Sequence, residues 1–561
     1  LSFKSSECKK NYIFFAIKGS TYDGNKFIID AIRNGAKTIV SDSKYQGYKN
    51  NVLFIKSTNV RKTIAYVSSK IYKNIPKNLI AVTGTNGKSS IANFYLQILK
   101  YNKKNVASIG TLGIVTSSKT TELSNTTIDP LKLGKSLEKL KKRNIENVIL
   151  EASSHGLKQC RLDGLKFKIG IFTNLSHDHL DYHKSYKDYL NSKLLLFRNL
   201  LRKDSNIITD KDISEYEIIK SISKKKLLNL NTISNKKGDL SIISHKYIGE
   251  KQSLKINYKN KIYKFEINLI GKIQLKNVLM SMIAAYKSNI NFQKIINITK
   301  KINSVPGRFE KIGSLKNNSF VVLDYAHTPD ALKICLKNIK DQFKNRKISI
   351  VFGCGGDRDK FKRPLMGKIA NDYCDKIYLT DDNPRNENPN KIRHSIKKKI
   401  YDSKLYNISD REDAIKQAIE NLSAGEVLVV AGKGHETTQD YGSYKKNFSD
   451  KNCILKYIKK KNKILNNDLK FNIIKETSNN ESLSLKSKIR KASINSKEIK
   501  KNDVFFAIRG KNKDGNKFVD EALKKGACLA IVNRLDKSQH KTKQLKVKNT
   551  LDFLTKTSQI I

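Results

Sequence analysis

Cysteines, long apolar segments and acidic residues are all scarce in this 561-residue chain. Its seven cysteines lie far apart with no Cys-x-x-Cys pair, which argues against a zinc–thiolate site or a disulfide framework and favours free thiols in a reducing cytoplasm. No run of 18 apolar residues occurs, so no membrane span is expected. We therefore expect a cytoplasmic protein built from about two to four domains.

The shortage of acidic residues leaves the chain strongly basic. Asp and Glu number 51 against 110 Lys and Arg, which gives a formal net charge of +59. Such a charge is compatible with a surface for nucleic acid or an anionic membrane. The lysines are spread along the whole chain, however, and no nucleic-acid-binding motif is present. We favour a general compositional bias and expect no nucleic-acid partner, while a basic nucleic-acid-binding protein stays open as an alternative of another class.

A glycine-rich segment follows the first strongly apolar run. Residues 82–90 read Val-Thr-Gly-Thr-Asn-Gly-Lys-Ser-Ser and separate the apolar residues 79–81 from a helical pattern over 91–100. A strand, a glycine turn and a helix form a phosphate cradle in which Lys88 reaches the β/γ-phosphates and Ser89 holds Mg²⁺. We expect ATP and Mg²⁺ to bind here, through Gly84, Thr85, Asn86, Gly87, Lys88, Ser89 and Ser90.

Composition and periodicity divide the rest of the chain. Residues 1–78 are expected to form a small α/β domain, and residues 79–305 an α/β domain with a parallel sheet around the glycine-rich loop. Residues 306–456 form another alternating block, with strands expected at 320–323, 348–352, 376–380 and 426–431. The Lys- and Asn-rich residues 457–475 are expected to be a linker, followed by a further domain over 476–561.

That last domain repeats the start of the chain. Residues 11–19, 23–27 and 35–36 return as 502–510, 514–518 and 526–527, each shifted by 491 positions. One shift over three separate blocks indicates a duplicated domain. A second phosphate loop at this shift would fall beyond Ile561, so we expect no ATP site in the second copy.

Several further motifs follow the loop in a characteristic order. They are Glu-Ala-Ser-Ser-His-Gly-Leu-Lys-Gln-Cys-Arg at 151–161, Thr-Asn-Leu-Ser-His-Asp-His at 173–179, Ser-Lys-Leu-Leu-Leu-Phe at 192–197, Asp-Tyr-Ala-His-Thr-Pro-Asp at 324–330 and Asp-Asn-Pro-Arg-Asn-Glu at 382–387. With the compact loop, in which only two residues separate Gly84 from Gly87, they resemble the Mur ligases. These enzymes use ATP to join a carboxylate to an amine.

Within that family, residues 1–456 resemble the MurE type, which acts on UDP-N-acetylmuramoyl-L-alanyl-D-glutamate in peptidoglycan synthesis. Residues 476–561 resemble the N-terminal domain of the MurF type, so the whole resembles a fragment of a MurE–MurF fusion. The resemblance implies an α/β fold of three domains, with a small N-terminal domain, a central phosphate-loop ATPase domain and a Rossmann-like C-terminal domain. A partial second N-terminal domain would follow them.

The same resemblance assigns the central site. Glu151 would ligate Mg²⁺ with Ser89, His179 would ligate a second Mg²⁺, and Lys193 would be a Mg²⁺ ligand as a carbamate. From the residues alone, Lys193 begins an amphipathic helix and should be solvated. The UDP-substrate would bind through Ser5, Thr126, Thr127, Ser153, Gln159 and Arg161, whose hydroxyl, amide and guanidinium groups suit a sugar, peptide bonds and carboxylates. Further ATP contacts would come from Asn277, Arg308, Asp324 and His327.

The motif at 382–387 resembles the signature of enzymes that add meso-diaminopimelate rather than L-lysine. The extra carboxylate of diaminopimelate suits the guanidinium of Arg385, and Glu436 would bind the ammonium group. The implied pocket consists of Arg358, Asp382, Asn383, Pro384, Arg385, Gly432 and Glu436. We therefore expect a monomeric ATP-dependent ligase that works through an acyl phosphate. An L-lysine-adding ligase and a folylpolyglutamate-synthase-like ligase remain alternatives.

Overall fold

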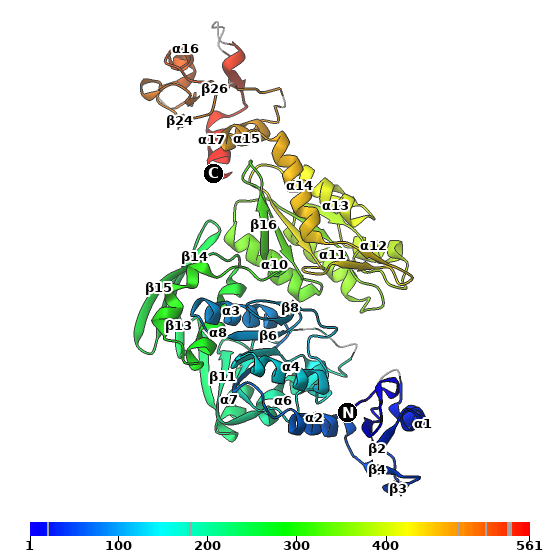
Figure 1. Cartoon of the computed structure of the whole chain (residues 1–561). Helices are drawn as coiled ribbons and strands as arrows, with labels where there is room; N and C mark the ends of the chain where they lie inside the picture. The colour runs from blue at the N-terminus through cyan, green and yellow to red at the C-terminus, as the bar shows by residue number, and fades with distance from the viewer. Residues whose placement is uncertain are drawn as a thin grey trace. The chain divides into compact units, whose positions relative to one another are not determined.

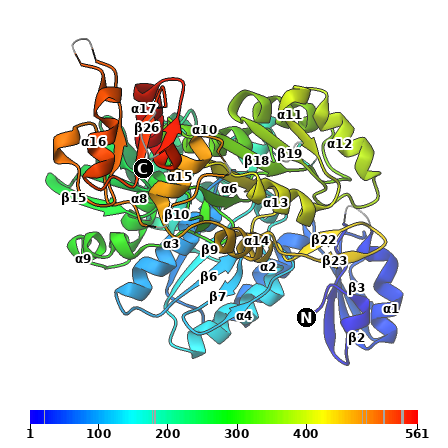
Figure 2. The same ribbon diagram turned by 90° about the horizontal axis from the view of Figure 1, so that it is seen from above.

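The computed structural model describes residues 1–19, 22–176, 178, 182–480, 482–485, 487–510, 513–535 and 541–560, and all counts below refer to these residues. The chain divides into two compact units, Leu1–Val305 and Pro306–Ile561. Figures 1 and 2 show the ribbon from two directions. None of the helices within the described ranges is both long and apolar enough to cross a membrane.

A small four-stranded sheet of order β1-β2-β4-β3 begins the first unit, with β3 antiparallel to its neighbour. Phe14 and Ala31 belong to a core on one face, and Phe15 and Ile64 to a core on the other, so one helix covers each face. The elements are β1 (Tyr12–Phe15), α1 (Ile28–Arg33), β2 (Ala36–Ser41), β3 (Gly47–Lys49), β4 (Val52–Lys56) and α2 (Val60–Ile71).

The larger sheet of the first unit has the order β15-β14-β13-β12-β11-β10-β5-β9-β6-β7-β8. Neighbouring strands from β13 to β6 pair in parallel, whereas the outer strands β14 and β15 at one edge and β7 and β8 at the other pair antiparallel. The strands are β5 (Asn78–Thr83), β6 (Val106–Gly110), β7 (Gly113–Val115), β8 (Thr120–Thr121), β9 (Asn147–Glu151), β10 (Phe167–Phe172), β11 (Leu201–Asp210), β12 (Asn229–Ser234), β13 (Leu240–Ile248), β14 (Lys251–Tyr258) and β15 (Lys261–Ile267).

Helices cover both faces of this sheet. Along β5, Ile80 and Val82 face one core and Leu79 and Ala81 the other, as the two-residue repeat of a strand requires. The first core includes α3 (Lys88–Tyr101), α8 (Lys272–Lys287) and α9 (Phe292–Asn297); the second includes α4 (Pro130–Lys142), α5 (Ser154–Lys158), α6 (Tyr186–Leu195) and α7 (Tyr216–Lys225). Because β5, β9 and β10 are parallel neighbours, the loops after them meet at one edge.

The second unit begins with a six-stranded sheet of order β16-β17-β21-β18-β19-β20, in which only β16 is antiparallel. The predicted strands at 320–323, 348–352, 376–380 and 426–431 are confirmed as β17 (Phe320–Asp324), β18 (Ile348–Phe352), β19 (Lys376–Leu379) and β21 (Val427–Ala431). The remaining elements are β16 (Glu310–Ser314), β20 (Leu405–Asn407), α10 (Pro329–Gln342), α11 (Lys362–Tyr373), α12 (Pro389–Lys397), α13 (Arg411–Glu420) and the hairpin of β22 (Thr438–Asp440) and β23 (Lys445–Asn447).

The stretch 457–475, expected from its composition to be a linker, is mostly helical. It contains the end of α14 (Asp450–Ile464) and most of α15 (Leu469–Thr477). Tyr457 and Ile458 of α14 lie in the core of the six-stranded sheet, and Phe471 and Ile474 of α15 lie in the core of the domain that follows. Although this stretch is rich in Lys and Asn, it therefore contains parts of two helices that each have an apolar face.

The repeated segment folds as its first copy does. Helix α16 (Val519–Lys524) lies 491 positions after α1, and Asp514 accepts a hydrogen bond from the Asn516 backbone as Asp23 does from Asn25. The sheet has the order β24-β25-β26-β27 with all pairs parallel. Its strands are β24 (Ala492–Ser493), β25 (Val504–Phe506), β26 (Leu529–Val532) and β27 (Gln544–Lys546), and α17 (Thr550–Ile560) follows.

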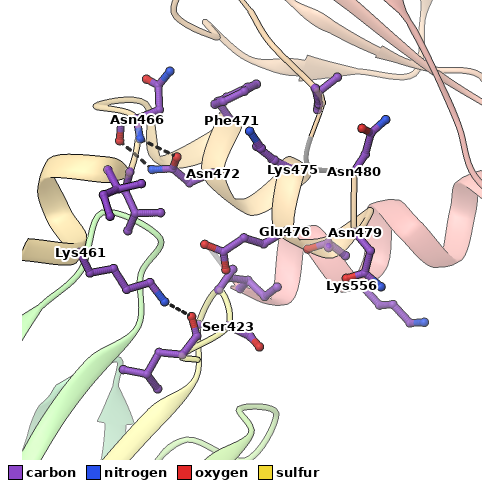
Figure 3. A pocket seen from close by; sticks show the side chains of 18 of the residues that line it. Ser423, Lys461, Asn466, Phe471, Asn472, Lys475, Glu476, Asn479, Asn480 and Lys556 are labelled. Atoms are coloured by element: carbon purple, nitrogen blue, oxygen red, sulfur yellow. Dashed lines mark hydrogen bonds between the residues drawn. The ribbon is translucent and has the colours of Figure 1, made fainter. Parts of the chain in front are cut away.

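Helix α15 joins this repeated domain to the six-stranded part of the second unit. It packs beside α17, and both helices border a groove of about 1280 Å³ (Figure 3). Asn317, which is fully buried in the β16–β17 turn, donates to both carboxylate oxygens of Glu476 at 2.8 and 3.0 Å. Asn472 donates to the Lys316 carbonyl at 3.0 Å. The turn at 316–318 therefore receives the polar edge of α15.

Candidate active site

The glycine-rich loop connects β5 to α3, as the sequence indicates. Gly84 and Gly87 have φ values of 143° and 91°, a region that favours glycine. A Cβ atom on Gly84 would lie 1.8 Å from Thr173 Oγ1, and one on Gly87 would lie 2.6 Å from Asn277 Oδ1. The loop therefore needs glycine for its backbone angles and for the close approach of Thr173 and Asn277.

Side chains after β10 hold the loop in this shape. Asn86 donates its backbone N–H to Asn174 Oδ1 at 3.0 Å, and Thr173 Oγ1 donates to the Asn86 carbonyl at 2.6 Å. The Thr85 N–H donates to the Asn174 carbonyl at 2.9 Å. Because these bonds fix the loop before any ligand arrives, little reorganisation is needed when an anion binds.

Lys88 is the first residue of α3 and folds back over the loop. Its Nζ donates to the carbonyl oxygens of Gly84 at 2.9 Å and of Thr85 at 2.8 Å. The positive end of the α3 dipole points to the same place. The ammonium group and the helix terminus together make this turn suitable for phosphate.

Glu151 ends β9 beside the loop and is only 3% exposed. Its Oε2 accepts from Ser89 Oγ at 2.9 Å and from Thr111 Oγ1 at 3.1 Å, and its Oε1 accepts from the Thr111 N–H at 2.9 Å. A carboxylate and a hydroxyl are hard oxygen donors, and Mg²⁺ in nucleotide sites binds through one or two such groups plus phosphates. Ser89 and Glu151 therefore fit Mg²⁺. His179 lies outside the described residues.

The expectation for Lys193 as a solvated residue at the start of an amphipathic helix is wrong. It lies near the end of α6 and is 1% exposed. Its Nζ donates to the Gly84 carbonyl at 2.7 Å and sits 4.3 Å from the centre of the Tyr189 ring, one helical turn away. Burial lowers the pKa of Lys193 well below its ordinary range, and the Lys88 charge adds to this effect.

The residues expected to hold the UDP-substrate gather beside Glu151. Thr127 Oγ1 lies 2.8 Å from the Glu151 carbonyl and accepts from the Ser153 N–H at 2.9 Å. Arg161 donates to Gln159 Oε1 at 2.7 and 3.1 Å and also to the Thr127 carbonyl. Burial lowers the pKa of Arg161 from its ordinary value.

Thr126 and Ser5 are the two other residues expected to hold the UDP-substrate. Thr126 Oγ1 lies 3.1 Å from Thr111 Oγ1 and so joins the group around Glu151. Ser5 belongs instead to the small N-terminal sheet region, in the turn Ser5–Glu7. The structure thus brings five of the six residues together. It also adds Thr111 and Tyr189, which have no motif to mark them in the sequence.

In the second unit, Arg308, Asp324 and His327 surround Tyr325. The Arg308 guanidinium lies 4.3 Å from the centre of the Tyr325 ring, and His327 Nδ1 lies 2.9 Å from the Tyr325 carbonyl. The Asp324 carboxylate accepts from the backbone N–H groups of Phe309 at 2.8 Å and Ala326 at 2.9 Å. Burial raises the pKa of Asp324, and these bonds make it a brace between β17 and the loop before β16.

The loop at 382–387 lies at the carboxyl end of β19. Arg385 has φ 52° and donates from Nη1 to the Gly356 carbonyl at 2.6 Å, while its side chain remains half-buried. Asp382 is 8% exposed, and its Oδ2 has no hydrogen-bond partner among the described residues. Gly432, with φ 111°, approaches this oxygen so closely that a Cβ would lie 2.6 Å away. Pro384 is buried, whereas Arg358 is exposed.

Glu436 faces the same loop. It accepts from Asn383 Nδ2 at 3.0 Å, Lys433 Nζ at 3.0 Å and the Tyr325 hydroxyl at 3.2 Å. Although burial opposes it, the Lys433 charge and these donors hold the pKa of Glu436 below its ordinary value. Sequence reasoning missed Lys433 and Tyr325. The position of Lys433 between Gly432 and Gly434 is the sequence feature that could have indicated it.

The first unit has a phosphate loop with a buried carboxylate, Glu151, on the neighbouring strand β9. The second unit has a loop with the guanidinium of Arg385 and a segment with the carboxylate of Glu436 facing that loop. These features are typical of a nucleotide-dependent α/β enzyme. Family models give the same answer: the Mur ligase middle domain matches residues 82–285, the Mur ligase glutamate ligase domain matches 307–434, and the Mur ligase family catalytic domain matches both 1–81 and 488–558. The chain belongs to the Mur ligase family, so the predicted family is confirmed.

Individual relatives are similar over most of their length. The UDP-N-acetylmuramoyl-L-alanyl-D-glutamate–2,6-diaminopimelate ligase of Rickettsia montanensis is 39% identical over 464 residues, which is 82% of this chain and 95% of that protein. The ligase of the same name from Fusobacterium nucleatum is 35% identical over 463 residues, covering 80% of this chain and 92% of its own.

Solved structures support the predicted three-domain α/β fold. A structure of a UDP-N-acetylmuramoyl-L-alanyl-D-glutamate–2,6-diaminopimelate ligase aligns with a TM-score of 0.61 and 31% identity, over 82% of this chain and 94% of that one. MurF ligase from Thermotoga maritima in complex with ADP aligns with a TM-score of 0.54 at 18% identity, over 82% of this chain and 97% of that one. At that identity the second likeness concerns the fold alone.

Proposed function

We propose that this chain is an ATP-dependent ligase that adds meso-diaminopimelate to UDP-N-acetylmuramoyl-L-alanyl-D-glutamate in peptidoglycan synthesis. The observation that carries the proposal is the position of Glu151. Its carboxylate meets Ser89 of the phosphate loop, and its carbonyl meets Thr127 of the group expected to hold the UDP-substrate. One residue therefore links the group expected to hold ATP to the group expected to hold the UDP-substrate, and the relatives' names supply the identity of the substrates.

In the proposed reaction the D-glutamyl γ-carboxylate attacks the γ-phosphorus of ATP and releases ADP. The resulting acyl phosphate is attacked by the amine of diaminopimelate, and phosphate leaves as the amide forms. Lys88, the N–H groups of the loop and the α3 terminus stabilise the phosphate charge. Mg²⁺, held by Ser89 and Glu151, would supply further charge neutralisation. The protein's main contribution is to position the reactants.

The state of Lys193 is part of the proposal. A lysine whose pKa is lowered by burial is neutral for a larger fraction of the time. A neutral amine can add CO₂ and lose a proton, which converts the side chain into an anionic carbamate. Such a group, together with His179, is our proposed ligand set for a second Mg²⁺.

The amino acid is proposed to bind at the loop 382–387. The Arg385 guanidinium would pair with the distal carboxylate of diaminopimelate, and Glu436 with its ammonium group. Asp382 and Asn383 complete the polar surface, while Pro384 and Gly432 allow the close approach of the two loops. Arg358 is exposed and directly follows Asp357, which accepts from Asn386 of this loop at 2.9 Å, and it would contribute a second positive charge.

The test is phosphate release by the purified chain with ATP, Mg²⁺ and UDP-N-acetylmuramoyl-L-alanyl-D-glutamate. We expect release with meso-diaminopimelate and little with L-lysine. Release with lysine alone would keep the ligase and contradict the specificity, whereas no release with either would contradict the proposed function. The cytoplasmic location and the monomeric state remain predictions.

A further inference from the structure

Lys433 is a charged side chain that the reaction outlined above does not use. It lies in the segment between β21 and β22, flanked by Gly432 and Gly434, and its side chain is fully buried. Burying an ammonium group is costly unless it is paired and hydrogen-bonded. Its partners therefore explain why the fold retains a lysine at this position.

All the donors of this ammonium group have protein acceptors. Lys433 Nζ donates to Asn383 Oδ1 at 2.9 Å, to Glu436 Oε2 at 3.0 Å and to the Thr438 carbonyl at 2.7 Å. An ammonium group has three N–H donors. Lys433 is thus occupied by the protein itself and has no donor left for a ligand.

Two of these acceptors belong to the segments proposed to bind the amino acid: Asn383 lies in the loop 382–387, and Glu436 lies in the segment that faces this loop. Asn383 Oδ1 also accepts from the Asp440 N–H at 2.9 Å, and Asn383 Nδ2 donates to Glu436 Oε2 at 3.0 Å. The Asp440 carbonyl in turn accepts from the Arg385 N–H at 3.0 Å. A single network therefore connects Lys433 to the backbone of Arg385 and to the Glu436 carboxylate.

The charges of this network matter as much as its bonds. Glu436 keeps 30% of its side chain exposed while Lys433, behind it, is covered completely. Lys433 compensates the Glu436 charge from the protein side, so the exposed carboxylate stays ionised and oriented. A zwitterionic amino acid end, with an ammonium and a carboxylate, would meet a fixed Glu436 and a fixed Arg385.

We propose that Lys433 is a positioning residue of the amino-acid site: it fixes the Glu436 carboxylate and the Asn383 loop so that together they recognise the distal zwitterion of the incoming amino acid. This inference rests on the proposed function. It concerns a residue that acts through its neighbours and does not touch the substrate.

The test compares Lys433→Met with Lys456→Met. Lys456 is a matched control because it also pairs with a glutamate, Glu412, but is half exposed on the outer helix α14. In Lys433→Met we expect the KM for diaminopimelate to rise roughly tenfold to a hundredfold, as for a buried polar group that loses its partner. We expect the KM for ATP to stay within about twofold in both variants.

A double-mutant cycle separates positioning from general damage. In a Glu436→Gln background, Lys433→Met should raise the KM for diaminopimelate much less than in the wild type, because the residue through which it acts has changed. Equal KM increases for ATP and diaminopimelate, or an unchanged effect in the Glu436→Gln background, would overturn the proposal.

Lys433→Gln provides a second variant, in case Lys433→Met does not fold. It keeps amide donors without the charge, and we expect an intermediate KM for diaminopimelate. An unaltered KM in this folded variant would also overturn the proposal. Failure of the proposed function is distinguishable, because then the wild type itself shows no amino-acid-dependent phosphate release.

Discussion

At the scale of single residues, Lys88 provides the charge over the phosphate loop. Lys88→Ala removes the ammonium group that donates to the Gly84 and Thr85 carbonyls, so a phosphate bound in the loop would lose this positive charge. We expect kcat for phosphate release to fall by roughly a hundredfold or more, as for other preorganised charge stabilisers. The unfolding midpoint should change little. A folded variant with near-normal turnover would contradict the role assigned to Lys88.

Arg385 is the residue expected to distinguish diaminopimelate from L-lysine. In Arg385→Ala we expect kcat/KM for diaminopimelate to fall by about 30-fold or more, since a charged pair is worth roughly 2–5 kcal/mol when one partner is removed. The side chain is only half-buried, which favours the lower end of this range. Activity with L-lysine should change much less. Equal losses with the two amino acids would contradict specificity through Arg385.

The sequence predicted several residues that the structure brings together at the candidate sites, but not their surroundings. The spacing of Gly84, Gly87 and Lys88 was sufficient because a phosphate loop is local. Lys193 was misjudged because the groups that bury it are distant: its acceptor, the Gly84 carbonyl, lies 109 positions earlier. Lys433 was missed because its role depends on Asn383, 50 positions away. Local patterns reveal what a side chain can do, and long-range packing decides what it does.

At the scale of elements, the turn from β5 to α3 depends on the absence of a side chain at Gly87. Gly87→Ala places a Cβ 2.6 Å from Asn277 Oδ1 and strains a φ of 91°. A left-handed conformation costs a non-glycine residue about 1–2 kcal/mol. We expect a higher KM for ATP together with a lower unfolding midpoint.

Gly249→Ala is the matched control for this change. Gly249 also has a positive φ, 57°, but a Cβ added there would meet nothing within 4 Å. Gly249→Ala should lower the unfolding midpoint through backbone strain and leave the KM for ATP unaltered. If both variants raise the KM for ATP equally, the contact between Gly87 and Asn277 does not shape the loop.

Helix α15 leads to a pH prediction. Burial raises the pKa of Glu476 above its ordinary value of 4.5, although Asn317 and Lys461 oppose this shift. The folded state therefore binds this proton more tightly than the unfolded state. The stability that this group contributes is complete below the unfolded pKa and is lost as pH rises through the folded pKa.

Glu476→Gln removes this titration. As pH is raised from about 4 to 7, we expect the wild type to lose stability relative to Glu476→Gln in urea unfolding. Glu420→Gln, at an exposed position lining the same groove, is the control for removing a carboxylate from this surface. A pH-independent difference for Glu476→Gln would contradict the argument.

The helices and strands that the sequence predicted best are those whose side chains are buried within a single core. The mostly apolar segments at 320–323 and 348–352 form β17 and β18 because strands buried on both faces need nearly continuous apolar residues. Helix α15 was not expected because its polar edge is satisfied by Asn317, which lies 159 positions before Glu476. Only the fold shows that this asparagine is buried and turned toward the helix.

At the scale of the whole molecule, the chain combines a Mur ligase with a second copy of the N-terminal domain type. The family model for that domain matches both 1–81 and 488–558, and the two copies share caps and turns at one constant shift. Within the second unit the repeated domain contacts the six-stranded part through α15 and through Ile560, whose carbonyl accepts from Asn318. The repeated domain is therefore packed against the six-stranded part and is not joined to it by the chain connection alone.

Truncation tests whether the ligase needs the repeated domain. Because Tyr457 and Ile458 of α14 lie in the core of the six-stranded sheet, the cut must follow Leu465 so that α14 remains. The residues required by the proposed reaction all precede this point. We expect kcat/KM for phosphate release to change by less than about threefold. The unfolding midpoint should fall modestly, because Asn317 and Gly425 lose the cover of Glu476 and Ile560. A cut after Ser449, which removes α14, should prevent folding of the second unit. If the chain ending at Leu465 folds and is inactive, the repeated domain contributes to the ligase reaction itself.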